Sequence, residues 1–267
     1  MVCRELIGKS LWTPQVFLKG NISSEKSDDE ILTLFFGVNS TYRADEKLQN
    51  NLTLFEWVTR NKLFPNFWGR NINGETPLTS LEMKFLYDKN CRIVPIYFIS
   101  GEFRTEDQGI DIAKEAATLL KNLNFPRNSA LFLEADTESV MTRDFLRGYI
   151  IGIKNEGFVP GFRADTDAKY IFDREFSRGL QTDRSLFKDA LIWAKEPLLE
   201  EFNEITTTHM IHPDNWKPYA PSGIKRSEIA LWQYGEKCHP IYSDNDELIT
   251  FDVDLIRDPE FFSQVML

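Results

Sequence analysis

The chain has 267 residues, 42% hydrophobic and 27% charged, which is the composition of a globular protein with enough apolar residues for a full core. Its 31 Lys and Arg against 41 Asp and Glu give a formal net charge of −10, which argues against binding to nucleic acid or to an anionic membrane surface. The cysteines, Cys3, Cys91 and Cys238, form no CxxC pair, so neither a disulfide framework nor a zinc site is expected. No apolar run approaches the ~20 residues of a transmembrane helix, so no membrane span is predicted.

The N-terminal residues carry no long apolar segment. Residues 1–10, MVCRELIGKS, do not resemble a signal peptide, and we expect either a cytoplasmic protein or one whose leader has been removed. Residues 1–30 end in the polar run SSEKSDDE and are predicted to form an N-terminal extension. Residues 31–267 are assigned to one domain, because a barrel of about 250 residues commonly forms a single unit.

Eight short runs of apolar, β-branched or aromatic residues predict strands. They cover residues 31–38, 64–69, 92–99, 130–133, 158–162, 191–194, 229–233 and 248–256. Most of these runs are separated by stretches in which apolar residues recur at helical spacing. The predicted helices cover residues 79–89, 108–123, 140–156 and 167–178.

The ends of these helices carry recognisable signals. Thr79, followed three residues later by Glu82, predicts a capping box at the start of the first helix. Pro126 ends the second soon after its last turn, and Gly157 and Gly179 stand just past the ends of the third and the fourth.

Eight strands that alternate with helices predict an α/β protein with a single (β/α)8 TIM-type barrel. An open doubly wound sheet is the alternative. The last third is less regular, because the Pro-rich stretch 195–227 offers only one short helix. A long irregular connection of this kind is usually either functional or mobile.

In a parallel barrel the reactive groups lie at the C-terminal ends of the strands. The run 130–133 continues into Glu134-Ala135-Asp136, and two-residue spacing places both carboxylates on one face, with Cβ atoms about 7 Å apart. Pairs of carboxylates at similar separations perform acid–base chemistry in glycosidases, where proximity and burial push the two pKa values apart. The alternative is that these acids cap the helix that follows.

A second pair of acids on one face, Asp252 and Asp254, lies in the last strand. Arg70 and Arg163 each follow an apolar run, so their charges should be neutralised, and we expect at least one of them to pair with a barrel acid. The first strand ends at Asn39, whose amide can hydrogen-bond a substrate but cannot act as an acid or a base.

Aromatic residues are expected in the same layer, where Trp and Tyr rings suit stacking on sugar faces, although core packing is the simpler role for each. These are Trp68, Tyr97, Trp193, Trp232 and Tyr234. The three histidines, His209, His212 and His239, have no metal-binding spacing, so no metal is expected. No dinucleotide or phosphate-binding motif is present, and no cofactor is predicted.

In order along the chain, several segments resemble a known family. GVNS, FWGRNI, LTSLEMKFLYDKNCRIVPIYF and the stretch from Gly109 through IAKEAATLLKNLNFPRNSALFLEAD resemble the glycoside-hydrolase-like domain called domain of unknown function 1906. GFRAD, ALIWAKEP, ALWQY and FDVDLI are similar to segments of the lysozyme-type muramidases of glycoside hydrolase family 25. The resemblance covers roughly residues 31–258.

The resemblance implies roles for individual residues. Asp136 occupies the position of the muramidase general acid, Glu134 that of its partner carboxylate, and Asp254 that of a late-strand aspartate. Asn39 stands where the muramidases have an aspartate. The tryptophan-glutamine-tyrosine motif of that family is matched directly by Trp232, Gln233 and Tyr234.

The sequence therefore predicts a muramidase-like glycoside hydrolase acting on a cell-wall or related polysaccharide, with Asp136 as general acid, its pKa raised by burial, and Glu134 as partner. A glycan is the expected ligand. A catalytically silent carbohydrate-binding barrel and an interaction barrel are the alternatives, which Asn39 and the acidic charge favour. The sugar, the linkage and the oligomeric state are left open. The predicted substrate-binding residues are Asn39, Arg70, Tyr97, Arg163, Trp193, Trp232, Gln233, Asp252 and Asp254.

Overall fold

The structure is a computed structural model that describes residues 34–48, 51–60, 63–199, 204–205, 216–240 and 249–257. The predicted N-terminal extension, His209 and His212 lie outside the described residues. Within them, none of the helices combines the length and the apolar character that crossing a bilayer requires.

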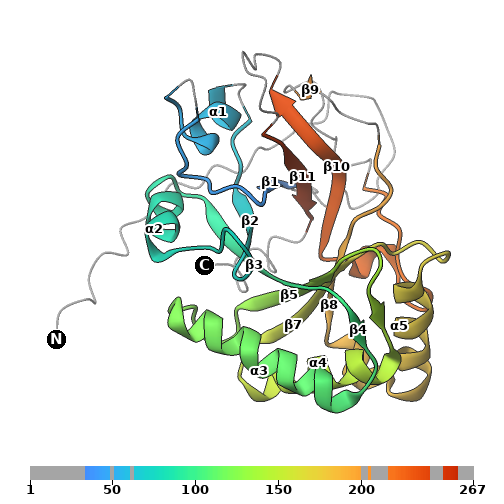
Figure 1. The fold of residues 1–267 in the computed structure, drawn as a ribbon. Coiled ribbons are helices and arrows are strands. Elements are labelled where there is room, and N and C mark those ends of the chain that lie inside the picture. Colours follow the sequence, from blue (N-terminus) through green and yellow to red (C-terminus); the bar gives the residue numbers. More distant parts are fainter. Residues whose placement is uncertain are drawn as a thin grey trace, which may run out of the picture.

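Eight strands close into a barrel (Figure 1), and each predicted strand run forms one of them. In order around the barrel they are β1 (Phe35–Asn39), β2 (Phe67–Asn71), β3 (Arg92–Ile99), β5 (Ala130–Ala135), β7 (Val159–Ala164), β8 (Leu191–Ala194), β10 (Leu231–Pro240) and β11 (Phe251–Ile256). The pairing of β11 with both β10 and β1 closes the ring and excludes the open sheet. The short β4 (Glu102–Phe103) pairs with β6 (Val140–Met141), and β9 (Glu204–Ile205) with the end of β10.

The last strand differs from the expected all-parallel barrel. The strands from β1 to β10 pair in parallel around the ring, whereas β11 runs antiparallel to both of its neighbours. Ten residues separate β10 from β11, fewer than the dozen or so that a parallel crossover needs. The reversal places Asp252, near the start of β11, opposite Asn39 at the end of β1, with Asp254 one layer deeper.

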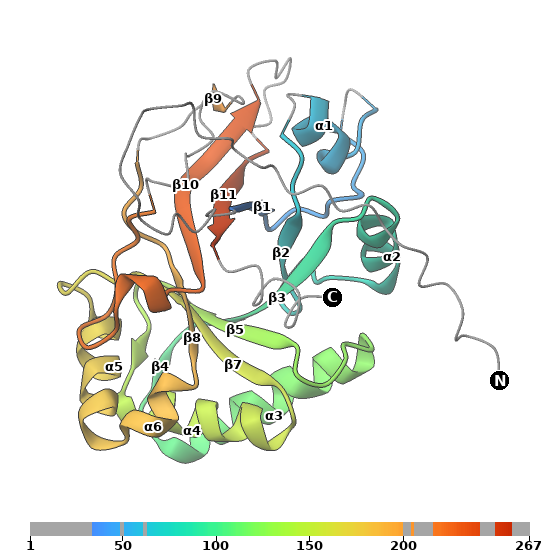
Figure 2. The same ribbon diagram turned by 180° about the vertical axis from the view of Figure 1, so that it is seen from behind.

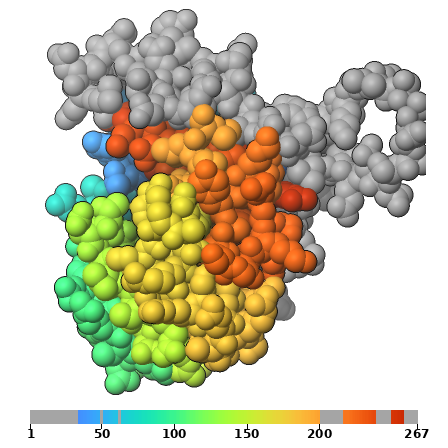
Figure 3. All heavy atoms as spheres, turned by 90° about the vertical axis from the view of Figure 1, so that its right-hand side faces the viewer, coloured from blue at the N-terminus to red at the C-terminus, as the bar shows by residue number. Residues whose placement is uncertain are grey.

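The helices cover the outside of the barrel. They are α1 (Leu54–Arg60), α2 (Ser80–Asp88), α3 (Glu106–Asn122), α4 (Arg143–Asn155), α5 (Ile171–Thr182) and α6 (Arg184–Lys188), with a 3-10 turn η3 (Arg226–Glu228) before β10. The four helices α3 to α6 gather on one side, and α1 and α2 lie beside β2 and β3 (Figures 1 and 2). The residues from α4 to β10, yellow to orange, form much of the described surface in Figure 3.

Helices α3 and α4 pack with their backbones in contact. A Cβ at Gly148 would lie 2.0 Å from the carbonyl oxygen of Glu106, and one at Gly152 would lie 2.4 Å from the Cβ of Ala113. Glycine is therefore required for this close approach, which holds the two helices against β5 and β7.

Two of the predicted helix ends are wrong in detail. Thr79 caps α2 by accepting a hydrogen bond from the backbone N–H of Glu82, but the Glu82 carboxylate turns away to Arg70, so the capping box is half formed. Helix α5 continues through Gly179 to Thr182. Glycine at position 179 does not end the helix; it is required by packing, because a Cβ there would lie 2.1 Å from the ring of Phe187 in α6.

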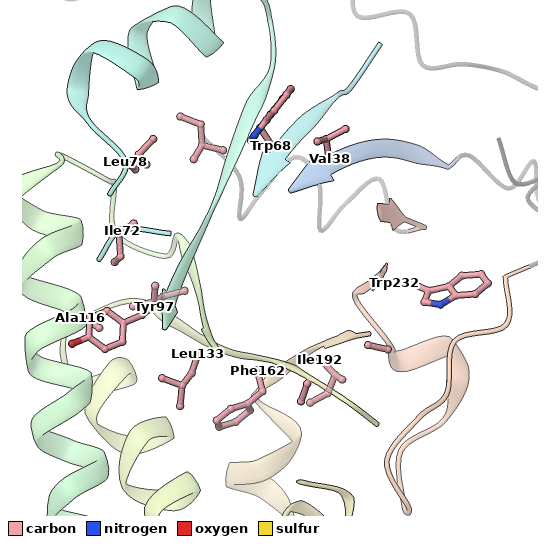
Figure 4. Packing of buried hydrophobic residues seen from close by; sticks show 14 of the residues in the cluster. Val38, Trp68, Ile72, Leu78, Tyr97, Ala116, Leu133, Phe162, Ile192 and Trp232 are labelled. Carbon is pink, nitrogen blue, oxygen red and sulfur yellow. The ribbon is translucent and has the colours of Figure 1, made fainter. Parts of the chain in front are cut away.

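Side chains alternate between an outer core under the helices and the barrel interior. Figure 4 shows members of the outer core, with Tyr97 of β3 lying beside Ala116 of α3. The interior is filled by a separate apolar cluster of Phe35, Phe67, Val94, Ile96, Ala130, Phe132, Trp193, Ala230, Leu231 and Ile256. Inward-facing glycines make room for its rings, since a Cβ at Gly37 would lie 2.2 Å from the ring of Phe67. The polar interior residues lie above this apolar plug, in the layer at the C-terminal mouth and the layer just beneath it.

Candidate functional site

The inward positions at the mouth of the barrel are polar and continue the alternation of the apolar interior. In register, Glu134 of β5 lies beside Arg163 of β7, and Asn39 of β1 beside Asp252 of β11. Gln233 of β10 is paired with Asp254 of β11. The structure therefore brings six of the predicted site residues together: Asn39, Glu134, Arg163, Gln233, Asp252 and Asp254.

Arg163 is the centre of this layer, and its side chain is only 6% exposed. Nη1 donates to Glu134, while Nη2 donates to Gln233 and, at 3.1 Å each, to Asn39 and Asp252. The guanidinium lies 5.2 Å from the ring centre of Trp193. Burial lowers its pKa, but the surrounding carboxylates outweigh burial and the pKa is raised. The predicted pairing of at least one arginine with a barrel acid is confirmed.

Asp254 lies beneath this layer and is completely buried. Its two oxygens accept hydrogen bonds from Asn39 Nδ2 at 2.7 Å and from Trp193 Nε1 at 2.9 Å. Burial raises the pKa of Asp254 to about 8, against the opposing effects of Arg163 and the Asn39 hydrogen bond. Asp254 therefore positions Asn39 and Trp193 and has no surface of its own for a ligand.

Asp252 and Glu134 flank Arg163 on either side. Asp252 also accepts a hydrogen bond at 3.0 Å from the backbone N–H of Lys237, next to a bulge in β10. Burial raises its pKa, although Arg163 lowers it, and the side chain remains 24% exposed. Glu134 lies 3.5 Å from Lys195 Nζ as well as against Arg163. The two carboxylates thus share one guanidinium but have different surroundings.

A pocket of about 650 Å³ opens above this layer. Asn39, Glu134, Arg163 and Asp252 line its floor, and the loops after β1 and β2 form its rim. The other lining residues are Ser40, Thr41, Tyr42, Asn71, Asn73, Gly74, Glu75, Thr76, Ile96, Phe98, Thr250 and Phe251. The pocket therefore lies at the C-terminal end of the parallel strands, where barrels of this kind carry their active sites.

The rim is held by Arg70, which does not reach the pocket. Arg70 is buried outside the barrel and pairs with Glu82 through Nε–Oε1 at 2.7 Å and Nη2–Oε2 at 3.2 Å. Its remaining N–H groups donate to the carbonyls of Ser40 and Thr41, both at 3.0 Å, and of Thr76 at 2.8 Å. Its prediction as a substrate-binding residue is wrong, because outward strand positions face the helices; Arg70 positions two rim loops instead.

The predicted aromatic residues are buried away from the pocket. Trp232 is 0% exposed, donates from Nε1 to the carbonyl of Pro197 at 3.1 Å and packs on Trp216. Tyr97 faces α3, and burial raises its pKa. Trp193 is inside the barrel, edge-on to Phe132 and below the polar layer. The prediction that these three rings stack on sugars is wrong. Tyr97 and Trp232 are packed in the outer core, and Trp193 is packed in the barrel interior.

Three other rings line the pocket, and two of them are exposed, Tyr42 and Phe98, whereas Phe251 is buried; none of the three was predicted from the sequence. Tyr42, in the loop after β1, and Phe98, near the end of β3, are each 37% exposed. Phe98 has the same parity as the interior residues Val94 and Ile96, so strand alternation could have selected it in place of Tyr97. Tyr42 has no comparable signal, since it lies in a loop.

Asp136 lies just beyond the end of β5, where the chain turns. Its Oδ1 accepts hydrogen bonds from Ser139 Oγ at 2.7 Å and from the backbone N–H of Glu138 at 3.1 Å. Hydrogen bonds from Ser100 and Ser139 hold its pKa below the usual value. The expected raised pKa is therefore wrong. The alternative, that Asp136 caps the following helix, is wrong as well, because Asp136 closes a turn before β6 and the N-cap of α4 is Thr142.

No group of three or more His, Cys, Asp or Glu side chains among the described residues is arranged to hold a metal ion. The functional groups on the pocket floor are two carboxylates, one amide and one guanidinium.

A family profile described as the Rv2525c-like, glycoside hydrolase-like domain matches residues 66–254. An uncharacterized B. stearothermophilus protein of known structure is 20% identical, with a TM-score of 0.69 over 87% of this chain and 100% of that one. The autolysin LytC from Streptococcus pneumoniae, solved with a synthetic peptidoglycan ligand, is 12% identical, with a TM-score of 0.44 over 83% of this chain and 46% of the autolysin. No curated protein matches. The B. stearothermophilus structure shows the fold, and the profile confirms the family resemblance found in the sequence.

Proposed function

Since the chain belongs to the Rv2525c-like, glycoside hydrolase-like domain family, we propose that the pocket at the mouth of its barrel binds a glycan. The observation that carries this proposal is the combination of a polar floor, with Glu134 and Asp252, and two exposed rings, Tyr42 and Phe98, around one pocket. Sugars present hydroxyl groups, which carboxylates and amides bind, and apolar C–H faces, which stack on aromatic rings.

The size of the pocket is consistent with this ligand. Its volume of about 650 Å³ falls within the range of roughly 300–1,000 Å³ that small-molecule sites occupy. The floor is rigid, because Arg163 ties strands β1, β5, β10 and β11 together through four side chains. A ligand would therefore meet donors and acceptors that are already in place.

The test is a calorimetric titration with soluble cell-wall glycan fragments. Phe98→Ala should weaken binding by about three- to tenfold, the range expected for one aromatic contact. Leu81→Ala is the matched control, because Leu81 is 74% exposed on α2 and does not line the pocket. Equal affinities for Phe98→Ala and the parent would contradict the proposed site.

Hydrolysis is a second candidate function, favoured by the different environments of the two pocket carboxylates. Asp252 has a raised pKa and would donate its proton to the glycosidic oxygen as the C–O bond breaks. Glu134, held against Arg163 and Lys195, would stabilise the positive charge that develops at the anomeric carbon. Water then adds to the anomeric carbon and gives one proton back to Asp252, which restores both the acid and the free sugar hydroxyl. Asp136 takes no part in this scheme.

Release of reducing sugar from a polysaccharide tests the second candidate. Glu134→Gln and Asp252→Asn should each abolish release, while Asp136→Asn should retain it, because the Asp136 side chain is engaged in a turn. If folded Asp136→Asn is inactive while Asp252→Asn is active, the proton donor is Asp136 and the scheme is wrong.

A further inference from the structure

The charged groups that face the pocket are unevenly balanced. Of the described residues that line it, Glu75, Glu134 and Asp252 are acidic and only Arg163 is basic. The cation is directed downward: Nη1 and Nη2 are both bonded to floor residues, and Nε is buried without a partner among the described residues. The guanidinium of Arg163 is therefore already engaged by two floor carboxylates, those of Glu134 and Asp252.

Two of the acids, Glu134 and Glu75, in contrast keep acceptor oxygens without a hydrogen-bond partner among the described residues, whereas both oxygens of Asp252 are engaged. Both cationic contacts of Glu134, with Arg163 and with Lys195, are made by Oε1, and no hydrogen bond to Oε2 is present within the described part of the chain. Glu75 is exposed on the rim, and its carboxylate has no ion pair or hydrogen bond with any of the described residues. An acceptor on the floor and an acceptor on the rim thus face the same space.

The backbone next to Glu75 is held by hydrogen bonds, although the Glu75 carboxylate has no partner among the described residues. The carbonyl of the next residue, Thr76, accepts from Arg70 Nη2 at 2.8 Å, and Thr76 Oγ1 donates to the carbonyl of Thr41 at 2.6 Å. The rim loop is therefore bound to the loop after β1, and Glu75 is presented from a structured backbone.

We propose that this pocket selects glycans that carry a free, protonated amino group over their N-acetylated counterparts and over acidic glycans. This inference rests on the proposed glycan binding and names the substrate class. An ammonium group offers three donors and no acceptor, which matches the open oxygens of Glu134 and Glu75. An acidic sugar meets the same oxygens as like charges, in a chain whose net charge is −10.

The experiment compares three soluble oligomers of equal length by calorimetry at mildly acidic pH: glucosamine, N-acetylglucosamine and galacturonate. The glucosamine oligomer should bind about three- to tenfold more tightly than the N-acetylated one, as expected for one charged contact near the surface. Added salt should reduce this preference, because exposed charges are screened.

Two variants locate the selectivity. Glu75→Gln should remove at least half of the preference, whereas the control Asp111→Asn, which removes an exposed acid from α3, should keep it. Binding of the N-acetylated or galacturonate oligomer with equal or higher affinity would overturn the selectivity while leaving glycan binding intact. If Glu75→Gln keeps the full preference, the role of Glu75 is wrong. Failure of all three oligomers, and of cell-wall fragments, to bind would overturn the proposed function itself.

Discussion

Asn39 and Asp254 are joined by a buried hydrogen bond of 2.7 Å from Asn39 Nδ2 to Asp254 Oδ2, across the antiparallel pair β1 and β11. Asn39 also accepts from Arg163 with its other amide atom, so one neutral side chain bridges a buried acid and a buried cation. A carboxylate at position 39 could accept from Arg163 but could not donate to Asp254 when ionised. The amide is therefore suited to the acid beneath it.

Asn39→Asp should lower the free energy of unfolding by about 1–3 kcal/mol above pH 8, since two adjacent carboxylates replace a donor–acceptor pair. In mild acid the loss should be smaller, because one shared proton restores a hydrogen bond. Urea denaturation of variant and parent at the two pH values measures this difference. Equal losses at both would contradict the proposed pairing.

The pH dependence of stability should carry the signature of Asp254. Its pKa is raised in the folded protein, from the ordinary value of 3.8 to about 8, so the folded state holds the proton more tightly. The stabilisation is complete below about pH 4 and is lost as the pH rises toward about 8, at no more than about 1.4 kcal/mol per pH unit. Asp254→Asn should flatten this slope, and Asp111→Asn should not. Urea denaturation across that range is the measurement, and an unchanged slope in Asp254→Asn would assign it to another group.

Arg70→Met should lower the free energy of unfolding by about 3–5 kcal/mol, because it leaves Glu82 buried without its cation. Lys84→Ala is the control: it breaks the exposed Lys84–Asp88 pair and should change stability by less than about 1 kcal/mol. Chemical denaturation distinguishes the two. A loss near that of the control would mean that Glu82 finds another partner.

Gly69→Ala tests how tightly the polar layer is packed. A Cβ at this position would lie 2.7 Å from the Cβ of Asn39 and 2.8 Å from the ring of Trp193. Overpacking of this kind costs about 1–3 kcal/mol, and it should also weaken glycan binding by displacing Asn39. Denaturation and calorimetry on the same variant check both effects. Unchanged stability with unchanged affinity would show that the layer can relax.

The hydrophobic pattern along the chain was sufficient to predict most of the barrel. The apolar runs predicted all eight barrel strands, because burial on a pleated strand depends on residues close together in the chain. The same alternation, followed from an interior residue such as Ile96, distinguishes Phe98 at the pocket from Tyr97 under α3. The prediction of Tyr97 as a pocket residue is wrong, because an odd-numbered position on this strand faces the outer core.

The sequence by itself determined the strands and placed Glu134 at the mouth, because strand alternation is a local property, whereas Asp252 reaches the mouth in place of Asp254 only because β11 is reversed. Only the tertiary structure decided that β11 is reversed, that Arg70 pairs with Glu82 and that Arg163 lies between Glu134 and Asp252. These contacts join residues 12 to 215 positions apart: Arg70 with Glu82 is the shortest separation and Asn39 with Asp254 the longest. A buried charge is stable only when it is paired, and the closed barrel decides which oppositely charged residue lies near enough to pair with it. Residues close together in the chain do not contain that information.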